Sequence, residues 1–407
     1  MSLRSALLVL TSLGIACGGR GRPGAAPETE QARSAEQARA AEQARAAPAL
    51  ARGDLEVDLR RHAGLARVLD RSGDYRLQVL VGVPAPGGGW LRRDGYRVDA
   101  EYFYPASAIK LCEAVAALEL VAERRDRGAA GLDPSAGFVS KTKRRPGIAS
   151  VADLVTAAIV MSDNDASNDL FDLAGADGLH ERMWRLGLSS VRMRHRLGVA
   201  PGDDARATPQ VSLLVAGASH VVARREGRLA LGKNEGSGVH VGESHLVAGR
   251  VVDEPMSFED KNRVSLEDLQ GLLVAVMRPE LHDGALPRLG ERERSVLVGA
   301  LSALPSDRGA KPSVDAEHKP LLPGIERVVP RGSIALASKG GRAYGFMVEN
   351  AYVVDRRSGR SFFLAATLYA NANGRLNDDR YEYQDVAYPA LADLGEVVAR
   401  AVFDAED

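Results

Sequence analysis

Apolar residues fill nearly every position of the stretch Ile109–Ala122, and only Lys110 at its start, Glu113 and Glu119 interrupt it. A helix that is apolar on all sides lies inside a core rather than on a surface. The charged residues at 123–127 and the glycine that follows, Gly128, are typical of a helix C-terminus. The pattern therefore predicts one long buried helix.

The segments before this helix show two other periodicities. An amphipathic helix is predicted over 55–70, because residues spaced three and four apart share one side: Leu55, Leu59, His62, Leu65 and Leu69. Alternating apolar residues predict a strand over Tyr75–Val81, and a Gly/Pro-rich turn at 84–89 leads to a second strand that begins at Trp90.

Helices are expected to dominate the middle of the chain. Ser150 and Asp153 form a capping-box-like start for a helix that runs to about Met161, and a further helix begins near Asp165. The remaining expectations for this region are a helix over 210–222, a hairpin within the Gly-rich stretch 225–252, a helix over 266–276 and irregular structure over 310–331.

The end of the chain returns to strand patterns. Strands are expected over 333–338, 343–354 and 362–369, followed by a last helix over 386–402. Strands at both ends with helices between them predict an α+β fold, in which one antiparallel sheet of N- and C-terminal strands packs with a helical subdomain.

Composition narrows the class of protein. The chain has 407 residues, of which 45% are apolar and 26% charged, and this balance is typical of a globular protein. The formal net charge of −1 gives no reason to expect a nucleic-acid partner.

The N-terminus carries an export signal. Arg4 precedes an apolar run, Ala6–Ile15, that is too short to span a bilayer and is typical of a signal peptide. Its end, Leu13–Cys17, resembles a bacterial lipoprotein box in which Cys17 is acylated, and the alternative is a plain signal peptide with an incidental cysteine. We expect a protein secreted across the inner membrane of a bacterium as a periplasmic or outer-membrane lipoprotein. Cys112, the other cysteine, is expected to be a buried core residue.

Three domain-level segments follow from these patterns. Residues 1–17 are the signal peptide, and 18–52 are a tether rich in Ala, Glu, Gln and Arg, with near-repeats of Glu-Gln-Ala-Arg. Residues 53–407 form the globular domain, with an insertion at about 215–330.

The strongest chemical signal is the pair Ser107 and Lys110. Three residues are about one helical turn, so the hydroxyl and the amine lie on one face. A serine becomes a nucleophile when a neighbouring base takes its proton, and a lysine can be that base when burial lowers its pKa. Considered alone, Ser107 is as easily a helix cap, and Lys110 a surface lysine at the helix edge.

Two further short motifs follow in chain order. Ser162-Asp163-Asn164 lies between two predicted helices, and Lys339-Gly340-Gly341 lies between two predicted strands. Together with Ser107-x-x-Lys110, they resemble the motifs of the serine β-lactamase and penicillin-binding-protein superfamily, class A-like in particular. The resemblance covers most of residues 70–400 and implies a β-lactamase/transpeptidase-like fold.

The resemblance also implies roles for the motif residues. Ser107 would form an acyl-enzyme, Lys110 would accept or relay its proton, and Ser162 would pass a proton to the leaving nitrogen beside Lys339. The substrate-binding residues implied are Asn164, which would hold the side-chain amide of the substrate, Gly341 of the third motif, and Arg342, whose backbone N–H would pair with that of Ser107 around the oxyanion.

The sequence departs from the family pattern at two places. Gly340 stands where the family has Thr or Ser, and Arg342 is a candidate replacement for the lost hydroxyl. Class A enzymes also carry a deacylating Glu on an Ω-shaped loop shortly before a P-G-D-like turn. The residues 201–203 and Thr208-Pro209 resemble the end of that loop, but the stretch 191–199 contains no acid. Asp203 and Asp204 are nearby, with no clear place for either beside the hydrolytic water.

We therefore expect a serine hydrolase that acts on β-lactams, with no cofactor and no metal site. The acidic stretch 163–172 lacks the glycine that a calcium loop requires at its sixth position. Two alternatives stay open. One is a DD-peptidase or penicillin-binding-like relative that acts on cell-wall peptides or another amide or ester, and the other is a non-catalytic relative. The long interval between Ser162 and Lys339 exceeds that of class A enzymes and suggests a lid, a subsite or a partner surface.

Overall fold

A central antiparallel sheet organises the protein. The computed structural model describes residues 55–85, 87–142, 147–199 and 204–404, so the predicted signal peptide, Cys17 and the tether lie outside the described residues. The sheet order is β13-β15-β16-β1-β2, with β14 paired to β15. Its strands are β1 (Gln78–Pro84), β2 (Leu91–Tyr96), β13 (Ile334–Ser338), β14 (Gly341–Ala343), β15 (Phe346–Asp355) and β16 (Ser361–Tyr369). Both ends of the chain contribute strands, which confirms the α+β prediction.

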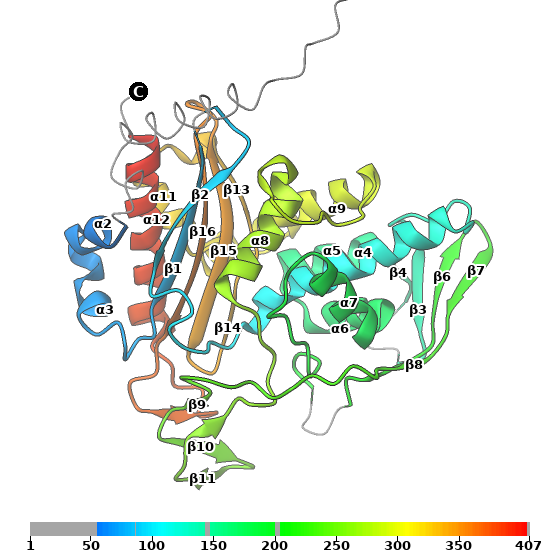
Figure 1. Ribbon diagram of the computed structural model, residues 1–407, viewed down its shortest axis with the longest axis horizontal. Helices are drawn as coiled ribbons and strands as arrows, with labels where there is room; N and C mark the ends of the chain where they lie inside the picture. Colours follow the sequence, from blue (N-terminus) through cyan, green and yellow to red (C-terminus); the bar gives the residue numbers. More distant parts are fainter. Residues whose placement is uncertain (1–54, 86, 143–146, 200–203, 405–407) are drawn as a thin grey trace, which may run out of the picture. The chain divides into compact units, whose positions relative to one another are not determined.

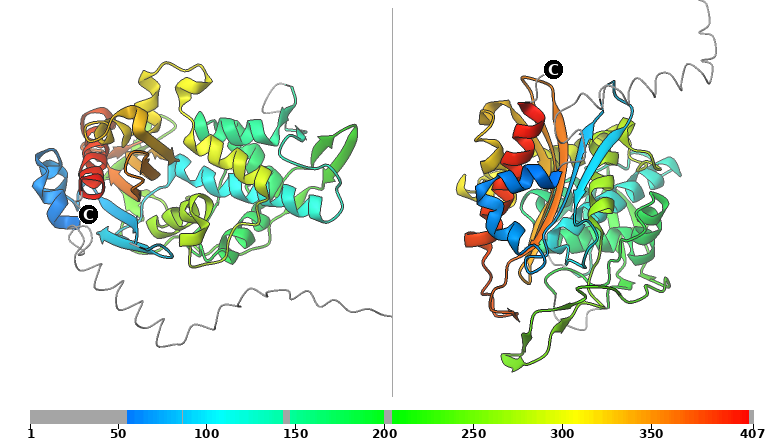
Figure 2. Two further views of the ribbon diagram at one scale, coloured as in Figure 1. Left: turned by 90° about the horizontal axis from the view of Figure 1, so that it is seen from above. Right: turned by 60° about the vertical axis from the view of Figure 1, so that its left-hand side comes forward.

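Helices cover both faces of this sheet, as Figures 1 and 2 show. Alternating residues of β15 enter two different cores: Met347 packs on the side of the terminal helices, and Val348 on the side of the large helical region. We use the name terminal helices for the helices on this side, although α11 comes from the middle of the chain: α2 (Leu55–Arg61), α3 (Ala66–Asp70), α11 (Leu322–Ile325) and α12 (Tyr388–Phe403).

The helical region is built around α4 (Lys110–Asp126), whose residues 110–122 are all buried. This result confirms the buried central helix and the burial of Cys112. The capping box at Ser150 is also confirmed, because Asp153 N–H donates to Ser150 Oγ at 3.0 Å. The neighbouring helices are α5 (Val151–Val160), α6 (Asn164–Ala174), α7 (Ala176–Arg185), α8 (Leu266–Met277) and α9 (Glu291–Ser302).

The helix predicted over 210–222 is wrong. The segment forms a hairpin of β6 (Val211–Val215) and β7 (Ala218–Val222), which joins β3 (Gly137–Ser140) and β4 (Ala149–Ser150) in a separate sheet. Ala216 and Gly217 both have positive φ, 46° and 82°. Two such residues make the tight turn that hairpins require, and this turn chemistry prevailed over the apolar periodicity.

The helix predicted over 55–70 is interrupted. The chain is extended at His62, and a short turn at Ala63–Leu65 separates α2 from α3. A Cβ at Gly64 would lie 2.0 Å from Asp393 Oδ2, so the glycine leaves room for this carboxylate of α12 at the break.

The segment between the helical region and the last strands is more regular than expected. Residues 310–331, predicted to be irregular, include α10 (Ser313–His318) as well as α11. The Gly-rich stretch does contain a hairpin, β10 (Ser244–Val247) with β11 (Arg250–Val252). The other short strands are β5 (Ala207–Thr208), β8 (Arg225–Glu226), β9 (His240–Val241), β12 (Met256–Ser257) and β17 (Arg375–Leu376).

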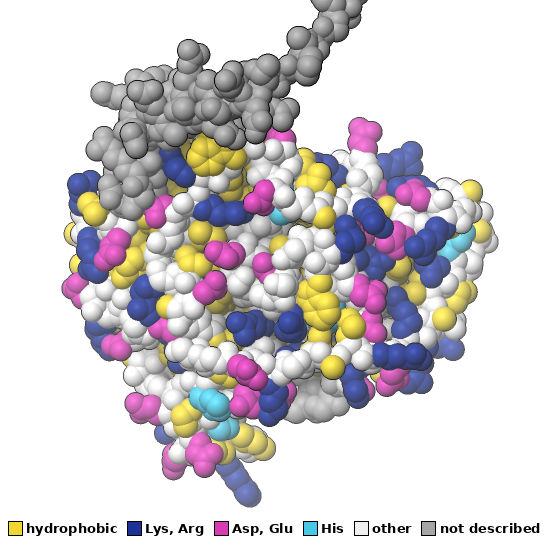
Figure 3. All heavy atoms as spheres, in the orientation of Figure 1, with side chains coloured by type: hydrophobic (Ala, Val, Ile, Leu, Met, Phe, Trp, Pro, Cys, Tyr) yellow, Lys and Arg dark blue, Asp and Glu magenta, His cyan; other side chains and the backbone are white. Residues whose placement is uncertain are grey.

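The surface carries charges of both signs. Basic and acidic side chains are interspersed over the face seen in Figure 3. No helix in the described part of the chain is both long and apolar enough to cross a bilayer. The lipid anchor and the secreted location stay predictions.

Candidate active site

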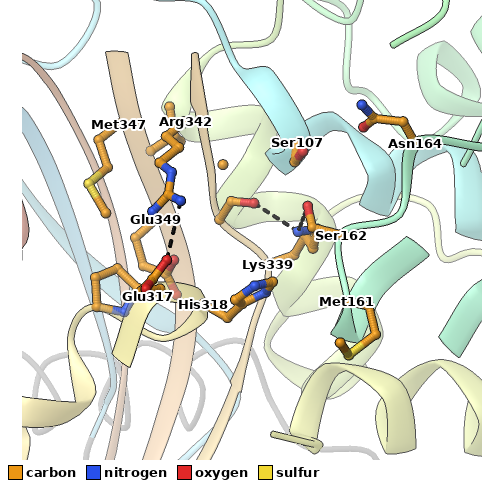
Figure 4. Close-up of a pocket in the computed structure, with 14 residues that line it drawn as sticks. Ser107, Met161, Ser162, Asn164, Glu317, His318, Lys339, Arg342, Met347 and Glu349 are labelled. Carbon is orange, nitrogen blue, oxygen red and sulfur yellow. Dashed lines mark hydrogen bonds and ion pairs between the residues drawn. The ribbon is translucent and has the colours of Figure 1, made fainter. Parts of the chain in front are cut away.

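The three motifs meet at one cavity between the sheet and the helical region. Ser107, Ser162, Asn164 and Lys339 line a space of about 270 Å³, and Figure 4 shows their side chains around it. The first comes from the turn before α4, the next two from the junction of α5 and α6, and the lysine from the end of β13. Residues far apart in the sequence are thus brought together, as the motif order predicted.

Ser107 lies at the start of the central helix, in a short 3₁₀ turn, Ala106–Ile109. The residue before it, Ala106, has a φ of 46°, which costs a non-glycine residue about 1–3 kcal/mol. A Cβ at Gly341 would lie 2.3 Å from the Ser107 nitrogen, so β14 passes directly against the Ser107 amide. This close approach is what paired amide groups from Ser107 and β14 would require, and only a glycine permits it.

Lys110 is fully buried one turn further along α4. Its amine donates to Asn164 Oδ1 at 2.8 Å, to Ser162 Oγ at 3.3 Å and to the Ser162 carbonyl oxygen. Burial lowers the pKa of Lys110 to about 8, although the charges of Glu113 and Asp163 oppose this change. The sequence predicts that this amine lies within reach of Ser107. In the structure, the hydrogen bonds of the amine to described residues go to Ser162 and Asn164 instead.

Ser162 lies between the two lysines. Its hydroxyl oxygen is 3.3 Å from Lys110 Nζ and 3.0 Å from Lys339 Nζ. Ser162 has a φ of 56°, a conformation that non-glycine residues rarely adopt and that often marks a functional site. Asp163 caps α6 by accepting from Ala166 N–H at 2.8 Å, so the strained turn is held from the helix side.

Lys339 completes the polar cluster. It is 5% exposed, and its amine also donates to the Gly340 carbonyl oxygen at 3.0 Å. Burial holds the pKa of Lys339 well below its usual value, and the positive charges of Lys110 and Lys319 lower it further. An anionic group in this cavity would raise that pKa again, and would therefore favour the protonated form of Lys339 and be attracted by it.

Gly340, where the family pattern has Thr or Ser, has a structural cause. A Cβ at this position would lie 2.1 Å from Glu349 Oε2 and 2.6 Å from the Val348 carbonyl oxygen. The Glu349 carboxylate thus occupies the space that a threonine side chain would need, and the two residues exclude each other.

We expect Gly340→Thr to lower the free energy of unfolding by about 1–3 kcal/mol, since the Val348 carbonyl belongs to a central strand and cannot move away easily. Thermal and denaturant unfolding would measure the change. Gly332→Thr is the matched control, because a Cβ at Gly332 would meet no atom within 4 Å. Equal stability of the two variants would contradict the close approach of Glu349.

Arg342 is already occupied by protein partners. Its guanidinium pairs with Glu317 at 3.2 Å and donates to the Tyr388 hydroxyl. Both members of the ion pair are about 43% exposed at the rim of the cavity. The side chain is therefore not poised to replace the missing hydroxyl unless substrate displaces Glu317. Its backbone lies in β14, opposite Met347 of β15.

A long loop lies beside the site. Arg192 and Arg263 exchange two backbone hydrogen bonds of 2.9 Å, so the chain leaves and returns at one point. The loop between these two residues therefore closes at Arg263. Thr208, which the sequence comparison places near a loop end, lies within it in β5, which pairs with β8. The hairpin of β6 and β7 and the strands up to β12 lie within this excursion.

No acid of the described part of this loop lines the cavity. Asp204 bonds to Arg206 at 3.1 Å and borders a different cavity, next to His180, while Asp203 lies outside the described residues. The loop instead places Gly198 against Asn164, where a Cβ would lie 2.5 Å from Nδ2.

Sequence reasoning missed the opposite wall of the cavity. Glu317, His318 and Pro320, together with Glu349 of β15, line it beside Lys339. The signal available was weak, because the segment around His318 was interpreted as irregular and Glu349 lies inside an apolar strand pattern.

One group in the described part of the chain has metal-like spacing, and it lies away from this cavity. His62, Asp393 and Glu396 offer ligand atoms within 4.8 Å of one another. Arg327 donates to Asp393 Oδ1 at 2.7 Å and to Glu396 Oε2 at 2.9 Å. A guanidinium thus occupies the space between these acids, which fits an ion-pair network rather than a metal centre.

Comparison with known proteins supports the β-lactamase resemblance. Residues 96–219 match the model of the Beta-lactamase enzyme family, a segment that includes Ser107, Lys110 and Ser162. No curated protein matches the chain significantly in sequence. The structure is similar to a β-lactamase from Burkholderia vietnamiensis, with a TM-score of 0.50, 17% identity and coverage of 83% of this chain and 95% of that one. A β-lactamase from Streptosporangium roseum gives a TM-score of 0.49 and 18% identity, with coverage of 84% of this chain and 98% of that one.

These findings confirm the β-lactamase-like α+β fold and the resemblance to the serine β-lactamase and penicillin-binding-protein superfamily. The fold is that of the β-lactamases, and residues 96–219 match their enzyme family.

Proposed function

We propose that this chain, with the fold of the serine β-lactamases and penicillin-binding proteins, is a serine hydrolase that opens the amide of a β-lactam through an acyl-enzyme on Ser107. One observation supports this most directly. The Ser162 hydroxyl lies between the amines of Lys110 and Lys339, in the cavity that Ser107 lines.

Acylation follows from this arrangement. Ser107 Oγ attacks the strained carbonyl carbon while the neutral amine of Lys110 takes the hydroxyl proton. The carbonyl oxygen becomes an oxyanion, which the backbone N–H groups of Ser107 and Arg342 would stabilise. When the C–N bond breaks, Ser162 gives its proton to the leaving nitrogen and recovers one from a neighbouring ammonium. Lys339 would attract the carboxylate of the substrate, and Asn164 its side-chain amide.

Deacylation needs a base for the attacking water, and the described residues of the site offer no group in the expected place. The carboxylates that line the cavity in the described part of the chain are Glu317 and Glu349, and neither belongs to the loop that closes at Arg263. This observation favours the second candidate, a penicillin-binding-like relative that acts on cell-wall peptides and stays acylated by β-lactams.

Intact-mass spectrometry of the domain with a penicillin and a cephalosporin tests the proposal. A transient adduct with continued loss of substrate would support a β-lactamase. A persistent adduct on Ser107 would support the penicillin-binding-like candidate. Absence of any adduct with several β-lactams, from a protein shown to be folded, would contradict the proposal and direct the search to peptides and esters.

We expect the acylation rate to rise with pH and to reach its half-maximum near pH 8. The reason is that Lys110, with a pKa of about 8, becomes a neutral base as the pH rises through that value. Stopped-flow acylation measured from pH 6 to 10 would show the inflection.

Glu113 provides the control for this prediction. Burial raises its pKa to about 8, so it titrates together with Lys110, whose pKa its carboxylate raises. Glu113→Gln should therefore move the inflection to lower pH. A profile that is flat between pH 6 and 9 would argue against Lys110 as the base.

A further inference from the structure

Three lysines are buried around one part of this site, which is an unusual accumulation of positive charge. Lys110 is 0% exposed, Lys319 3% and Lys339 5%. Charges of one sign that face each other out of water destabilise one another and need compensation nearby. The described residues offer buried acids on both sides: Glu113 next to Lys110, and Glu349 next to Lys319 and Lys339. Asp315, also buried, acts on Lys319 as well.

Lys319 is built into the support of the third motif. Its amine donates to the Ser338 carbonyl oxygen and to the Leu301 carbonyl oxygen, each at 2.8 Å. Ser338 is the last residue of β13 and directly precedes Lys339. Lys319 therefore connects the segment between α10 and α11 to the backbone directly before Lys339.

Glu349 reaches the same point from the neighbouring strand. It is 1% exposed, it lines the cavity, and it fills the space that a side chain at Gly340 would need. A backbone hydrogen bond of 3.1 Å from Lys339 N–H to the Asn350 carbonyl oxygen fixes the register of this part of the sheet. The carboxylate is thus positioned by the strand itself.

We propose that Glu349 and Lys319 are positioning residues of the hydrolase site, which together hold Lys339 in place and in its cationic form beside Ser162. Lys319 fixes the backbone that presents Lys339. Glu349 offsets the repulsion between Lys319 and Lys339, and Gly340 is the consequence of making room for it. The catalytic part of this proposal rests on the proposed function.

The charges around these groups agree in sign with the proposal. Burial raises the pKa of Glu349 to about 7, and Lys319 and Lys339 oppose that rise. Burial likewise lowers the pKa of Lys319 to about 8, while Glu349 raises it. The titratable and charged groups that face this cluster from the packed elements are Lys110 of α4, Asp315, Glu317 and His318 of α10, and Arg342 of β14.

Removal of either group should change the titration of Lys339, with opposite signs. Glu349→Gln removes a negative charge, so the pKa of Lys339 should fall by about one unit. Lys319→Met removes a positive charge, so the pKa should rise instead. NMR of the protein with ¹³C-labelled lysine side chains, without substrate and assigned with Lys339→Arg, would follow this titration.

Two further variants serve as references. Glu349→Asp keeps the charge and should leave the titration of Lys339 close to that of the wild type. Glu317→Gln removes a carboxylate from the same cavity, but one that is paired with Arg342 and not among the charges acting on Lys339. It should not reproduce the effect of Glu349→Gln.

In the acylation assay, loss of the Lys339 proton should lower the rate at high pH, above the rise caused by Lys110. This fall should move to lower pH in Glu349→Gln, because Lys339 loses its proton earlier. An unchanged titration of Lys339 in whichever of Glu349→Gln and Lys319→Met folds, or shifts of the same sign in both, would overturn the proposal. If the titration shifts as expected but the wild type forms no acyl-enzyme, the proposed function fails and the positioning role stands.

Discussion

Ser107→Ala is expected to abolish acylation, with a loss of at least about 10⁴-fold in the rate of β-lactam consumption. The alanine keeps the backbone N–H that faces Gly341 and removes only the oxygen that forms the ester. Intact mass would show no adduct. The circular dichroism spectrum should match that of the wild type, since the Ser107 hydroxyl has no hydrogen bond to another described residue, and alanine keeps the backbone carbonyl that accepts from Lys110 N–H.

Ser219→Ala is the matched control, because Ser219 is exposed on β7 and takes no part in the cavity. It should form the adduct at the wild-type rate. An adduct that persists in Ser107→Ala, or that peptide mapping locates on another residue, would remove Ser107 from the mechanism.

The motifs could be predicted from the sequence because each depends on local structure. Ser107 and Lys110 are one helical turn apart, and Ser162 lies in the turn between two helices that were both expected. Their order along the chain then identified which parts of the fold had to meet. Local chemistry and family order together were sufficient for this part of the site.

The support behind Lys339 could not be predicted in the same way. Glu349 reaches Gly340 only through the register of β14 and β15, and Lys319 reaches Ser338 from a segment with no clear periodicity. A buried glutamate in an apolar strand pattern has no local signature. Its only trace in the sequence is Gly340, which stands where the family pattern has Thr or Ser.

The errors in the fold arose where tertiary contacts prevail over periodicity. The apolar spacing of 210–222 suits a helix, yet Ala216 and Gly217 form a hairpin turn and β6 pairs with β3. The contact between Arg192 and Arg263, which closes the loop beside the site, joins residues far apart in the sequence and has no local signature.

Lys110→Met is expected to lower the acylation rate by about 10³-fold, and to remove the inflection near pH 8. Methionine has a similar length and suits the buried position, so the change removes the base without opening a large cavity. Stopped-flow acylation measured from pH 6 to 10 would show both effects.

Loss of Lys110 also leaves Glu113 without its buried positive neighbour, and this could lower stability without any catalytic role. The double variant Lys110→Met/Glu113→Gln separates the two effects, because it removes both charges and should recover stability but not acylation. Recovery of acylation in the double variant would mean that Lys110 acts only by compensating Glu113. If acylation stays about 10³-fold slower while the unfolding free energy returns toward the wild-type value, the amine is the base that activates Ser107.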